Sequence, residues 1–514
     1  MKKNKIEKVD RISELPEPIL HHILSFLPRN QVARTCILSK RFETVWHTYP
    51  VLELIGGSYR QQQGDGIYEE PVRTKRSLNC FERFLRNREW KSEIKKFTIK
   101  EDLHEDPEMV LLADRCVGYA IESNVKELEL RFALWFVDNK QYRLPQVVLL
   151  AKSIEVLKLS GCSLELPRGN NILLHSLRTL CLSQVDVELI EDLVSKCPSI
   201  QDLRLSMCWF ESLKLTGFSK LNKLELEDIK GLERLDIKAL NVEFLSIVWS
   251  TIWLAPREIS SLAFCENLKS IYFKRVPITD DEWLCNQISN LPHLECLSIH
   301  YSQTLKKIKI SSPSLKTLSL VECRKLIKLE IDTPNLRFLH YRGTIITLCV
   351  NALALLKVDL DLPEFHWISE GLKSQSPIYE DVIFLRYMRR RQSSPLLSTE
   401  HLTLTFYRKH FDVAEVVDGL LWMAPHTKKI SMECASTMKY LLKFKYKKQL
   451  IYKGEVGSCC KCIPLSCWEH CIEEIEFEIR HVNDIKTYIL SGADIMEKID
   501  ALCKDNGLQE YSSI

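Results

Sequence analysis

The residues best suited to binding a metal lie close together near the C-terminal end of the sequence. They are soft ligands, namely Cys459, Cys460, Cys462, Cys467, His470 and Cys471. Two pairs have C-x2-C and C-x3-C spacing, which zinc sites use. Only four residues separate the two pairs, however, and Cys471 begins a predicted strand whose register is set by burial. We therefore predict reduced thiols here, with no metal and no cofactor.

Two short basic runs are the other candidate ligand-binding sequences. One spans 386 to 391 and the other, KFKYKK, spans 443 to 448. Both interleave aromatic and cationic side chains, a combination that can bind phosphate or nucleic acid. Runs this short more often form solvated faces, so we predict no nucleic-acid partner.

The sequence contains no recognised catalytic motif. We find no glycine-rich phosphate loop, no HExxH and no GxSxG elbow. Histidines and carboxylates are scattered without a shared spacing. We therefore expect a protein that is not an enzyme.

The overall composition is typical of a globular protein in a reducing compartment. The 514 residues are 45% apolar and 27% charged, with a net charge of +3. The first residues lack the apolar run of a secretory signal, and no window offers the ~18 to 20 apolar residues of a membrane span. Nineteen cysteines without such a signal indicate thiols. We expect a location in the nucleus, the cytoplasm or both, and no membrane partner.

Residues 10 to 50 predict three short helices. Pro16 suits a first helical turn, whose amides have no helical partner in any case. Apolar residues follow at helical spacing until Pro28 ends the helix: Ile19, Leu20, Ile23, Leu24 and Leu27. A second helix is predicted from Gln31 to Thr35, and Ser39 caps a third. A unit of this size can bury only a small core. We therefore expect its apolar stripes to be covered by a partner or by the rest of the chain.

This stretch closely resembles a plant-type F-box. The matching elements are Asp10-Arg11-Ile12-Ser13, Leu15-Pro16, Ile19-Leu20, the run from Ile23 to Pro28, the run from Arg34 to Arg41, and Trp46. The resemblance implies docking on a Skp-type adaptor, which would connect the chain to a cullin. Carried over by position, the adaptor-facing residues are Leu15, Pro16, Ile19, Leu20, Ile23, Leu38 and Trp46. Phe42 departs from the pattern, since many relatives have tryptophan there.

Most of the remaining sequence repeats a unit of the form LxxLxL. The first clear copy is Val125, Leu128 and Leu130. Later copies that start at 154, 177 and 200 are 23 residues apart, and those at 242, 268 and 294 are 26 apart. Both spacings are typical of leucine-rich repeats. One turn cannot bury its own apolar face, so the repeats should stack into a solenoid.

The repeat shortens after residue 294. Copies beginning at 305, 315, 326, 336 and 353 mostly start ten or eleven residues apart, which leaves no room for a helix. Each repeat of about 21 residues should therefore contribute two strands, one to each side of the solenoid. Residues between the leucines should point away from the core. From these we select candidates for binding a target protein: Lys316, Lys328, Arg337, Phe338 and His340.

The C-terminal segment is similar to the FBD-type module that often closes plant F-box repeat proteins. A strand is predicted from Cys471 to Ile479, with Ile475, Phe477 and Ile479 buried and the intervening glutamates in water. An amphipathic helix is predicted from Ile485 to Leu502.

These expectations give an α/β fold in which a short all-α F-box precedes a solenoid with a curved parallel sheet. Helices or a second strand should cover the convex side. The expected divisions are 10–50 for the F-box, 51–123 for a linker and capping region, 124–370 for the repeats, 371–455 for degenerate repeats and 456–514 for the FBD-like segment. The resemblance implies the substrate-recognition subunit of an SCF-type ubiquitin ligase, with an unknown target protein. The alternative is a ligand-sensing or scaffold repeat protein outside an active ligase.

Overall fold

The computed structural model forms two compact units, residues 1–232 and 233–514. It describes residues 12–56, 70–88, 93–103, 106–132, 141–165, 172–185, 190–251, 258–259, 262, 264–344, 346–362, 396, 398–406, 413–434, 438–447, 471–481, 484–492 and 495–505. The cysteine group from 459 to 470 and the basic run from 386 to 391 lie outside the described residues.

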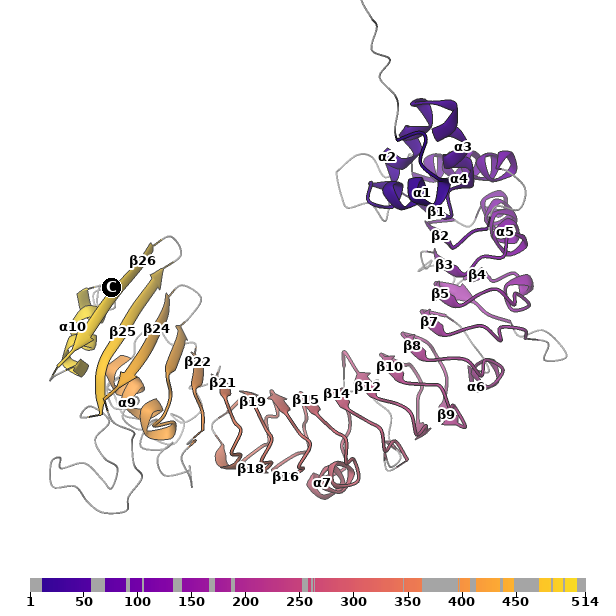
Figure 1. Ribbon diagram of the computed structural model, residues 1–514. Helices are drawn as coiled ribbons and strands as arrows, with labels where there is room; N and C mark the ends of the chain where they lie inside the picture. Colours follow the sequence, from indigo (N-terminus) through magenta and orange to yellow (C-terminus); the bar gives the residue numbers. More distant parts are fainter. Residues whose placement is uncertain are drawn as a thin grey trace, which may run out of the picture. The chain divides into compact units, whose positions relative to one another are not determined.

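The first unit begins with the predicted helices (Figure 1). They are α1 (Glu17–Ser25), α2 (Arg29–Arg34), the 3-10 turn η1 (Thr35–Ile37) and α3 (Lys40–Thr48). Pro16 is the N-cap of α1, and the Ser39 hydroxyl accepts a hydrogen bond from the Phe42 N–H at 3.3 Å at the start of α3. Both caps confirm the sequence prediction.

A parallel sheet follows in the first unit, with strand order β1-β2-β3-β5-β7-β8-β10. These strands are β1 (Val51–Ile55), β2 (Lys96–Glu101), β3 (Glu127–Phe132), β5 (Val156–Ser160), β7 (Thr179–Ser183), β8 (Asp202–Ser206) and β10 (Lys223–Glu227). The remaining elements are α4 (Glu70–Asn87), α5 (Pro107–Glu122), β4 (Tyr142–Arg143), η4 (Gln146–Val148), β6 (Cys162–Ser163), α6 (Ile190–Ser195) and β9 (Ser212–Thr216).

Residues 51–123, the expected linker and capping region, contain β1, α4, β2 and α5. The strands β1 and β2 already belong to the parallel sheet, so the solenoid begins at Val51. The Gly- and Gln-rich sequence from 56 to 74 predicts a loop, but the last part of this stretch is helical, because α4 begins at Glu70. The apolar residues at helical spacing, Leu78, Phe81 and Leu85, predict only the C-terminal part of this helix.

The second unit contains a parallel sheet of strand order β12-β14-β15-β17-β19-β21-β22-β23. These strands are β12 (Phe244–Val248), β14 (Ser270–Lys274), β15 (Cys296–His300), β17 (Thr317–Val321), β19 (Phe338–Arg342), β21 (Lys357–Leu362), β22 (His401–Phe406) and β23 (Lys429–Cys434). We call this sheet and its counterpart in the first unit the main sheets. Helices α7 (Asp281–Ser289) and α9 (Val413–Met423) lie in the connections.

The two-strand repeat predicted after residue 294 is confirmed. A second parallel sheet, β16-β18-β20, is formed by the strands that alternate with β15, β17, β19 and β21. Its strands are β16 (Lys307–Ser311), β18 (Lys328–Asp332) and β20 (Thr347–Asn351), and a shorter pair joins β11 (Arg234–Lys238) to β13 (Glu258–Ile259). The LxxLxL copy predicted to begin at 353 is wrong in its choice of core residues. Leu353 is 81% exposed, while Leu355, Val358 and Leu360 are buried.

The described part of the second unit closes with antiparallel strands and a helix. Strands β24 (Met438–Tyr446), β25 (Ile472–His481) and β26 (Asp484–Ser491) continue the sheet from β23, and α10 (Ile495–Asp505) follows. The predicted helix from Ile485 to Leu502 is therefore wrong in its first half. Gly492, with φ +91°, lies just beyond the end of β26. The β25 prediction is confirmed for its buried isoleucines and Phe477, but Glu478 is also buried.

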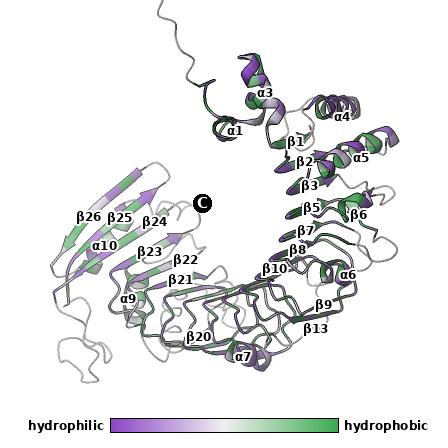
Figure 2. Ribbon diagram, turned by 45° about the vertical axis from the view of Figure 1, so that its right-hand side comes forward, coloured by the Kyte–Doolittle hydropathy of each residue, from purple (hydrophilic) through white to green (hydrophobic). Residues whose placement is uncertain are grey.

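Successive turns of the solenoid leave the main sheet in the same way. The residue after the strand has positive φ at Gly161, Gln184, Met207, Asp228, Arg275, Tyr301, Glu322 and Gly343. Its N–H can then bond the last carbonyl of the next strand, as Gln184 does with Ser206 at 2.8 Å and Tyr301 with Val321 at 2.7 Å. The following residue points into the core, which explains the buried Cys162, Cys208 and Cys323. Figure 2 shows the alternation of hydrophobic and hydrophilic residues along the strands.

Candidate adaptor-binding and target-binding surfaces

The three N-terminal helices enclose a small core of their own. Leu20 and Leu24 of α1 meet Val32, Val45 and Tyr49, and all five side chains are buried. Leu15, Phe42, Trp46 and Val51 pack partly buried against this cluster. Only one face of α1 packs into this core. The apolar residues on the other faces of α1 therefore remain outside the core.

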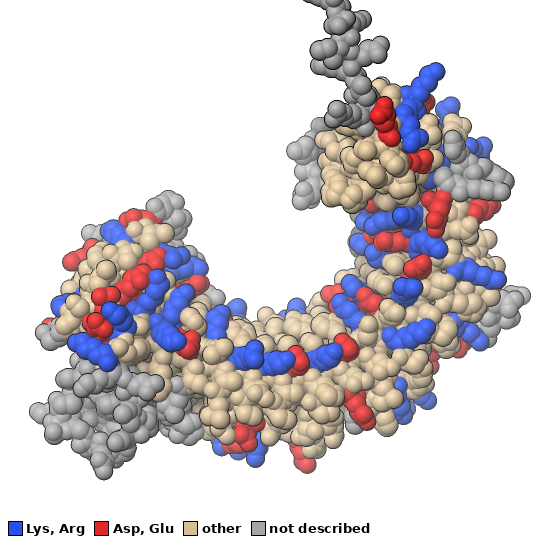
Figure 3. Space-filling model, viewed as in Figure 1, with Lys and Arg blue, Asp and Glu red and all other residues tan. Residues whose placement is uncertain are grey.

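An apolar patch covers the outer side of these helices. Ile19 and Ile23 on α1 and Phe26 at its C-cap follow one another at i, i+4 and i+7 and are 46%, 40% and 75% exposed. The apolar patch as we define it also includes exposed Ile12, Leu27, Ile37 and Leu38. Figure 3 shows a largely uncharged area over this part of the helices. Exposed apolar side chains in this number are typical of a protein-binding surface.

The structure separates the seven predicted adaptor-facing residues into two groups. Pro16, Ile19, Ile23 and Leu38 are exposed and Leu15 is half-buried. As a correction, Leu20 is 0% exposed and belongs to the core, so its side chain cannot face an adaptor directly. Trp46 is half-buried against Phe84 of α4, with ring centroids 5.1 Å apart. Its position indicates a role in joining the helices to the solenoid.

Sequence reasoning missed four members of the apolar patch as contact residues, and one of them, Leu27, is 37% exposed. Ile12, Phe26 and Ile37 are all more than half exposed. Phe26 extends the i, i+4 series of Ile19 and Ile23, and this spacing was the signal that could have identified it.

A buried arginine anchors these helices to α4. Arg88 is 3% exposed, and its guanidinium donates hydrogen bonds to the carbonyl oxygens of Tyr49 at 2.7 Å and Thr48 at 3.4 Å. These carbonyls end α3, where a positive charge is favourable. Burial lowers the pKa of Arg88. The side chain therefore fixes the end of α3 at the start of the solenoid.

Replacing Arg88 with methionine should destabilise this junction by about 2 kcal/mol, because two carbonyl oxygens lose a charged donor. Hydrogen exchange of the α3 amides would measure the loss. The matched control is Arg86→Met. Arg86 is 63% exposed and pairs only with Glu82 in a described ion pair, so its removal should cost less than about 1 kcal/mol. Equal effects of the two substitutions would contradict the anchoring role.

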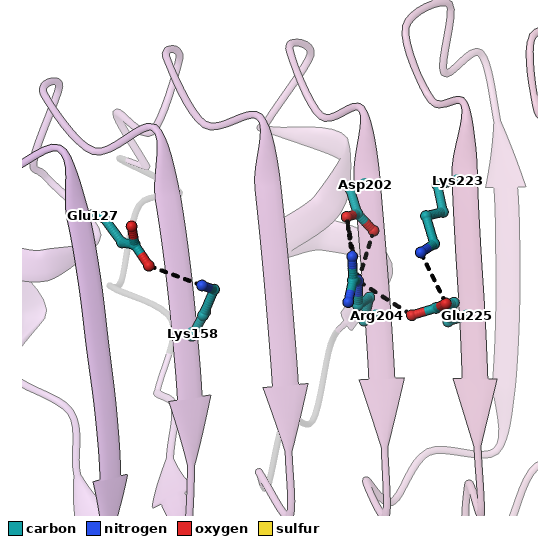
Figure 4. A network of polar contacts seen from close by, with 6 residues as sticks. All are labelled: Glu127, Lys158, Asp202, Arg204, Lys223 and Glu225. Carbon is teal, nitrogen blue, oxygen red and sulfur yellow. Dashed lines mark hydrogen bonds and ion pairs between the residues drawn. The ribbon is translucent and has the colours of Figure 1, made fainter. Parts of the chain in front are cut away.

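The exposed face of the first main sheet carries charges that neutralise one another. Glu127 of β3 lies 2.8 Å from Lys158 of β5, and Arg204 of β8 contacts both Asp202 at 2.7 Å and Glu225 at 3.1 Å (Figure 4). Glu129 is buried, and burial by itself raises its pKa, but the ion pairs with Lys100 at 3.0 Å and Arg131 at 2.7 Å outweigh this effect and lower the pKa. A partner would have to replace these ion pairs, so this face is poorly suited to binding a charged target.

The second main sheet has a face of different chemistry. The first two outward positions of β12, β14, β15, β17 and β19 hold no acid, lysine or arginine. We call them the neutral section: Phe244, Ser246, Ser270, Tyr272, Cys296, Ser298, Thr317, Ser319, Phe338 and His340. In the register, small side chains on β15 and β17 lie between the large ones of β14 and β19. This arrangement suits an uncharged protruding side chain of a partner.

A histidine next to the neutral section is held in its uncharged form. The Nδ1 atom of His300 lies 3.3 Å from the Tyr272 hydroxyl, and the two rings meet edge to face at 4.9 Å. Burial, with smaller effects from His340 and Lys274, lowers the pKa of His300 to about 4. At neutral pH the imidazole therefore adds hydrogen-bonding capacity without charge.

The low pKa of His300 predicts acid sensitivity of the second unit. An unfolded histidine has a pKa near ~6.5, so below that pH the unfolded chain binds more protons than the folded one. The free energy of unfolding should therefore fall as the pH drops from 6.5 toward 4. Because His300 is only half-buried, we expect about 1 kcal/mol by pH 5. Hydrogen exchange of β14 and β15 at pH 7 and pH 5 should show a loss in the wild type that His300→Gln lacks. Equal losses would contradict this assignment.

The structure does not bring all the predicted target-binding residues together. Phe338 and His340 lie on β19 within the neutral section, and the ring of Phe338 is 5.1 Å from the Lys357 amine. Lys316 and Arg337 are exposed just before β17 and β19, and Lys316 pairs with Glu295 at 2.8 Å. Lys328 lies on β18 in the other sheet and pairs with Glu330. It therefore does not share the main-sheet face.

The described part of the chain contains no helix with the length and apolar composition that a membrane span requires. Within the same residues, no group of three or more histidine, cysteine or acidic side chains is arranged to hold a metal ion. The predicted cysteine group from 459 to 470 is outside this part.

Comparisons with known families agree with the helical unit and the solenoid. Residues 12–53 match the model of the F-box domain. Residues 85–258 and 250–417 match a model described as At1g61320/AtMIF1, LRR domain, and these matches span more than half of the chain. The chain belongs to the F-box/leucine-rich-repeat family. The plant-type resemblance seen in the sequence is thereby confirmed.

Similar F-box proteins occur in Arabidopsis thaliana. Putative F-box/LRR-repeat protein At5g02700 is 28% identical over 39% of this chain and 39% of its own length. F-box/LRR-repeat protein At1g55660 is 31% identical over 45% of this chain and 58% of its own. FBD-associated F-box protein At5g60610 is 26% identical over 60% and 68%. The alignments thus span between about two fifths and two thirds of these relatives.

Proposed function

We propose that this chain is the substrate-recognition subunit of an SCF-type ubiquitin ligase. In this proposal the F-box binds a Skp-type adaptor and, through it, a cullin, while the solenoid binds a target protein. The observation that supports it best is the apolar patch, because the F-box core is complete without these exposed side chains. A second protein that covers the patch would remove them from water, at about 25 cal/mol per Å² of apolar surface.

The target would bind the neutral section of the second main sheet. Its serine, threonine, tyrosine and histidine side chains offer hydrogen bonds, and Phe244, Tyr272 and Phe338 offer apolar area. The self-neutralised charges of the first main sheet make a weaker site. We infer that the protein performs no bond chemistry. It holds the target close to a ubiquitin-loaded enzyme, which raises the effective concentration of the two reactants.

The proposal places the protein in the nucleus, the cytoplasm or both, in a reducing environment. No nucleic acid or membrane takes part in the mechanism.

Capture of a purified Skp-type adaptor tests the first step of this function. The full chain should retain the adaptor, and a chain beginning at Gly56, which lacks the F-box, should not. Retention by both chains, or by neither, would contradict the assignment of adaptor binding to the F-box.

A further inference from the structure

The last strand of the second unit has an unusual edge. In the part of the chain that the structure describes, β26 pairs along one side only, with β25. Figure 1 shows β26 as the final strand of this sheet. In an antiparallel ladder, alternate residues direct their N–H and C=O groups away from the existing neighbour. Such an edge can accept a further strand, and proteins usually protect it with charges, proline or a bulge.

The side chains of β26 give this edge an apolar strip. Ile485 and Ile489 are 61% and 70% exposed, and Thr487 between them is exposed as well. All three lie on the same face of the strand because they alternate in sequence. On the opposite face Leu490 is buried and α10 packs near β26, Tyr488 is half-buried, and Asp484 and Lys486 are exposed. The exposed apolar side chains of β26 therefore lie on one face, whereas the exposed residues of the other face are charged.

The neighbouring strand shows that this strip is a local exception. The residues of β25 opposite Ile489, Thr487 and Ile485 are Glu476, Glu478 and Arg480. These are charged, and they are paired: Glu476 contacts Lys443 at 2.8 Å, and Arg480 contacts Glu478. The face thus changes from paired charges to β-branched apolar side chains at the strand where the sheet ends.

The strip is complementary to itself. In an antiparallel pair of two β26 strands with Thr487 opposite its own copy, Ile485 lies opposite Ile489. Every outward position then faces a β-branched residue, a pairing that stabilises sheets. On the other face the same register places Lys486 opposite Tyr488, so no like charges meet. This register also uses Asp484 to Leu490, which is nearly the whole strand.

We propose that two copies of this chain associate through β26, as an antiparallel pair around a two-fold axis at Thr487. The partner is a second copy because the register that pairs the isoleucines also satisfies two-fold symmetry, in which each patch binds its own copy. The dimer carries two F-boxes and two neutral sections. A target with two binding segments would gain affinity from such an arrangement, without any new contact.

The mass of the full chain in solution tests the dimer. Light scattering coupled to gel filtration should give twice the chain mass of 59.9 kDa at micromolar concentration. The double variant Ile485→Lys with Ile489→Lys should give the single-chain mass, because the register places the introduced lysines of the two copies opposite each other. The matched control replaces two other exposed apolar residues, Ile327→Lys with Leu353→Lys, which are 51% and 81% exposed. The control should remain a dimer.

The register is tested by cross-linking. Under mild oxidation, Thr487→Cys should form a disulfide between copies, because residues paired across a two-fold axis lie about 4.5 to 5.5 Å apart at Cα. Lys486→Cys should remain at the wild-type background, since its counterpart is Tyr488.

Three results would overturn the proposal. They are a wild-type chain of single mass, a dimer that the lysines at 485 and 489 leave intact, and equal cross-linking at 486 and 487. The first would also leave β26 open to an extended segment of a different protein. The second would point to self-association through the apolar patch of the F-box, which these variants do not alter.

Discussion

A chain in which Ile19 and Ile23 are both replaced by aspartate should lose its affinity for a Skp-type adaptor. Both side chains are exposed on one face of α1, so the change leaves the F-box core of Leu20, Leu24 and Val45 intact. In the complex, each aspartate would be buried without a partner, which is costly. Central apolar contacts contribute about 2 kcal/mol or more each, so the dissociation constant should rise at least ~100-fold.

Biolayer interferometry with purified adaptor would measure this change, and circular dichroism would check that the helices remain. The matched control is Leu111→Asp on α5, since Leu111 is 50% exposed but lies outside the F-box. It should bind like the wild type. An Ile19/Ile23 variant that is folded and binds with unchanged affinity would remove the apolar patch from the account.

Gly161→Ala should destabilise the first unit by several kcal/mol. Gly161 leaves β5 with φ +68°, and a Cβ atom there would lie 2.1 Å from the carbonyl oxygen of Phe132. The backbone of the neighbouring turn cannot yield as a flexible side chain would. The left-handed conformation costs alanine roughly 1 to 2 kcal/mol, and the clash adds about 1 to 3 kcal/mol.

Hydrogen exchange of the β3 and β5 amides would report this loss. Gly217→Ala is the matched control, because Gly217 also has positive φ, +81°, but a Cβ atom there would meet nothing within 4 Å. Its cost should be limited to about 1 to 2 kcal/mol from the backbone conformation. If the two variants were equally stable, the close stacking of neighbouring turns at Gly161 would be wrong.

The solenoid could be predicted from the sequence because each turn repeats the same physical requirement. Leucines at alternate positions must face one core, and any shift by one residue would expose them. This fixed most strands, including β7 and β8, to within a residue or two. Before β21, Leu353 and Leu355 could each begin the LxxLxL unit. In the structure Leu355 is buried in the core and Leu353 is exposed.

The last strand of the C-terminal hairpin, β26, was not predictable by the same reasoning, although β25 was. Ile485 and Ile489 are four residues apart, a spacing that also fits the face of a helix. In the structure they lie on the exposed side of β26, where burial does not constrain their pattern. Hydrophobic periodicity indicates which residues are buried, so it does not predict an edge strand whose apolar residues face solvent.

The candidate surfaces were predicted only in part. The stripe of α1 includes Ile19, Leu20 and Ile23, and the sequence does not say which side of it faces the core. Only packing against Val32 and Val45 shows that Leu20 points inward. Similarly, Lys328 and Phe338 occupy equivalent positions in LxxLxL units, but successive units alternate between two sheets.

The most direct test of the proposed ligase role is the composition of the assembled complex. The full chain would be mixed with a Skp-type adaptor and a cullin, and the complex would be separated by gel filtration. The account predicts that all three proteins elute together and that the cullin leaves the complex when the chain carries the Ile19 and Ile23 substitutions. A complex of chain and adaptor from which the cullin always elutes separately would contradict the ligase role and leave a repeat scaffold.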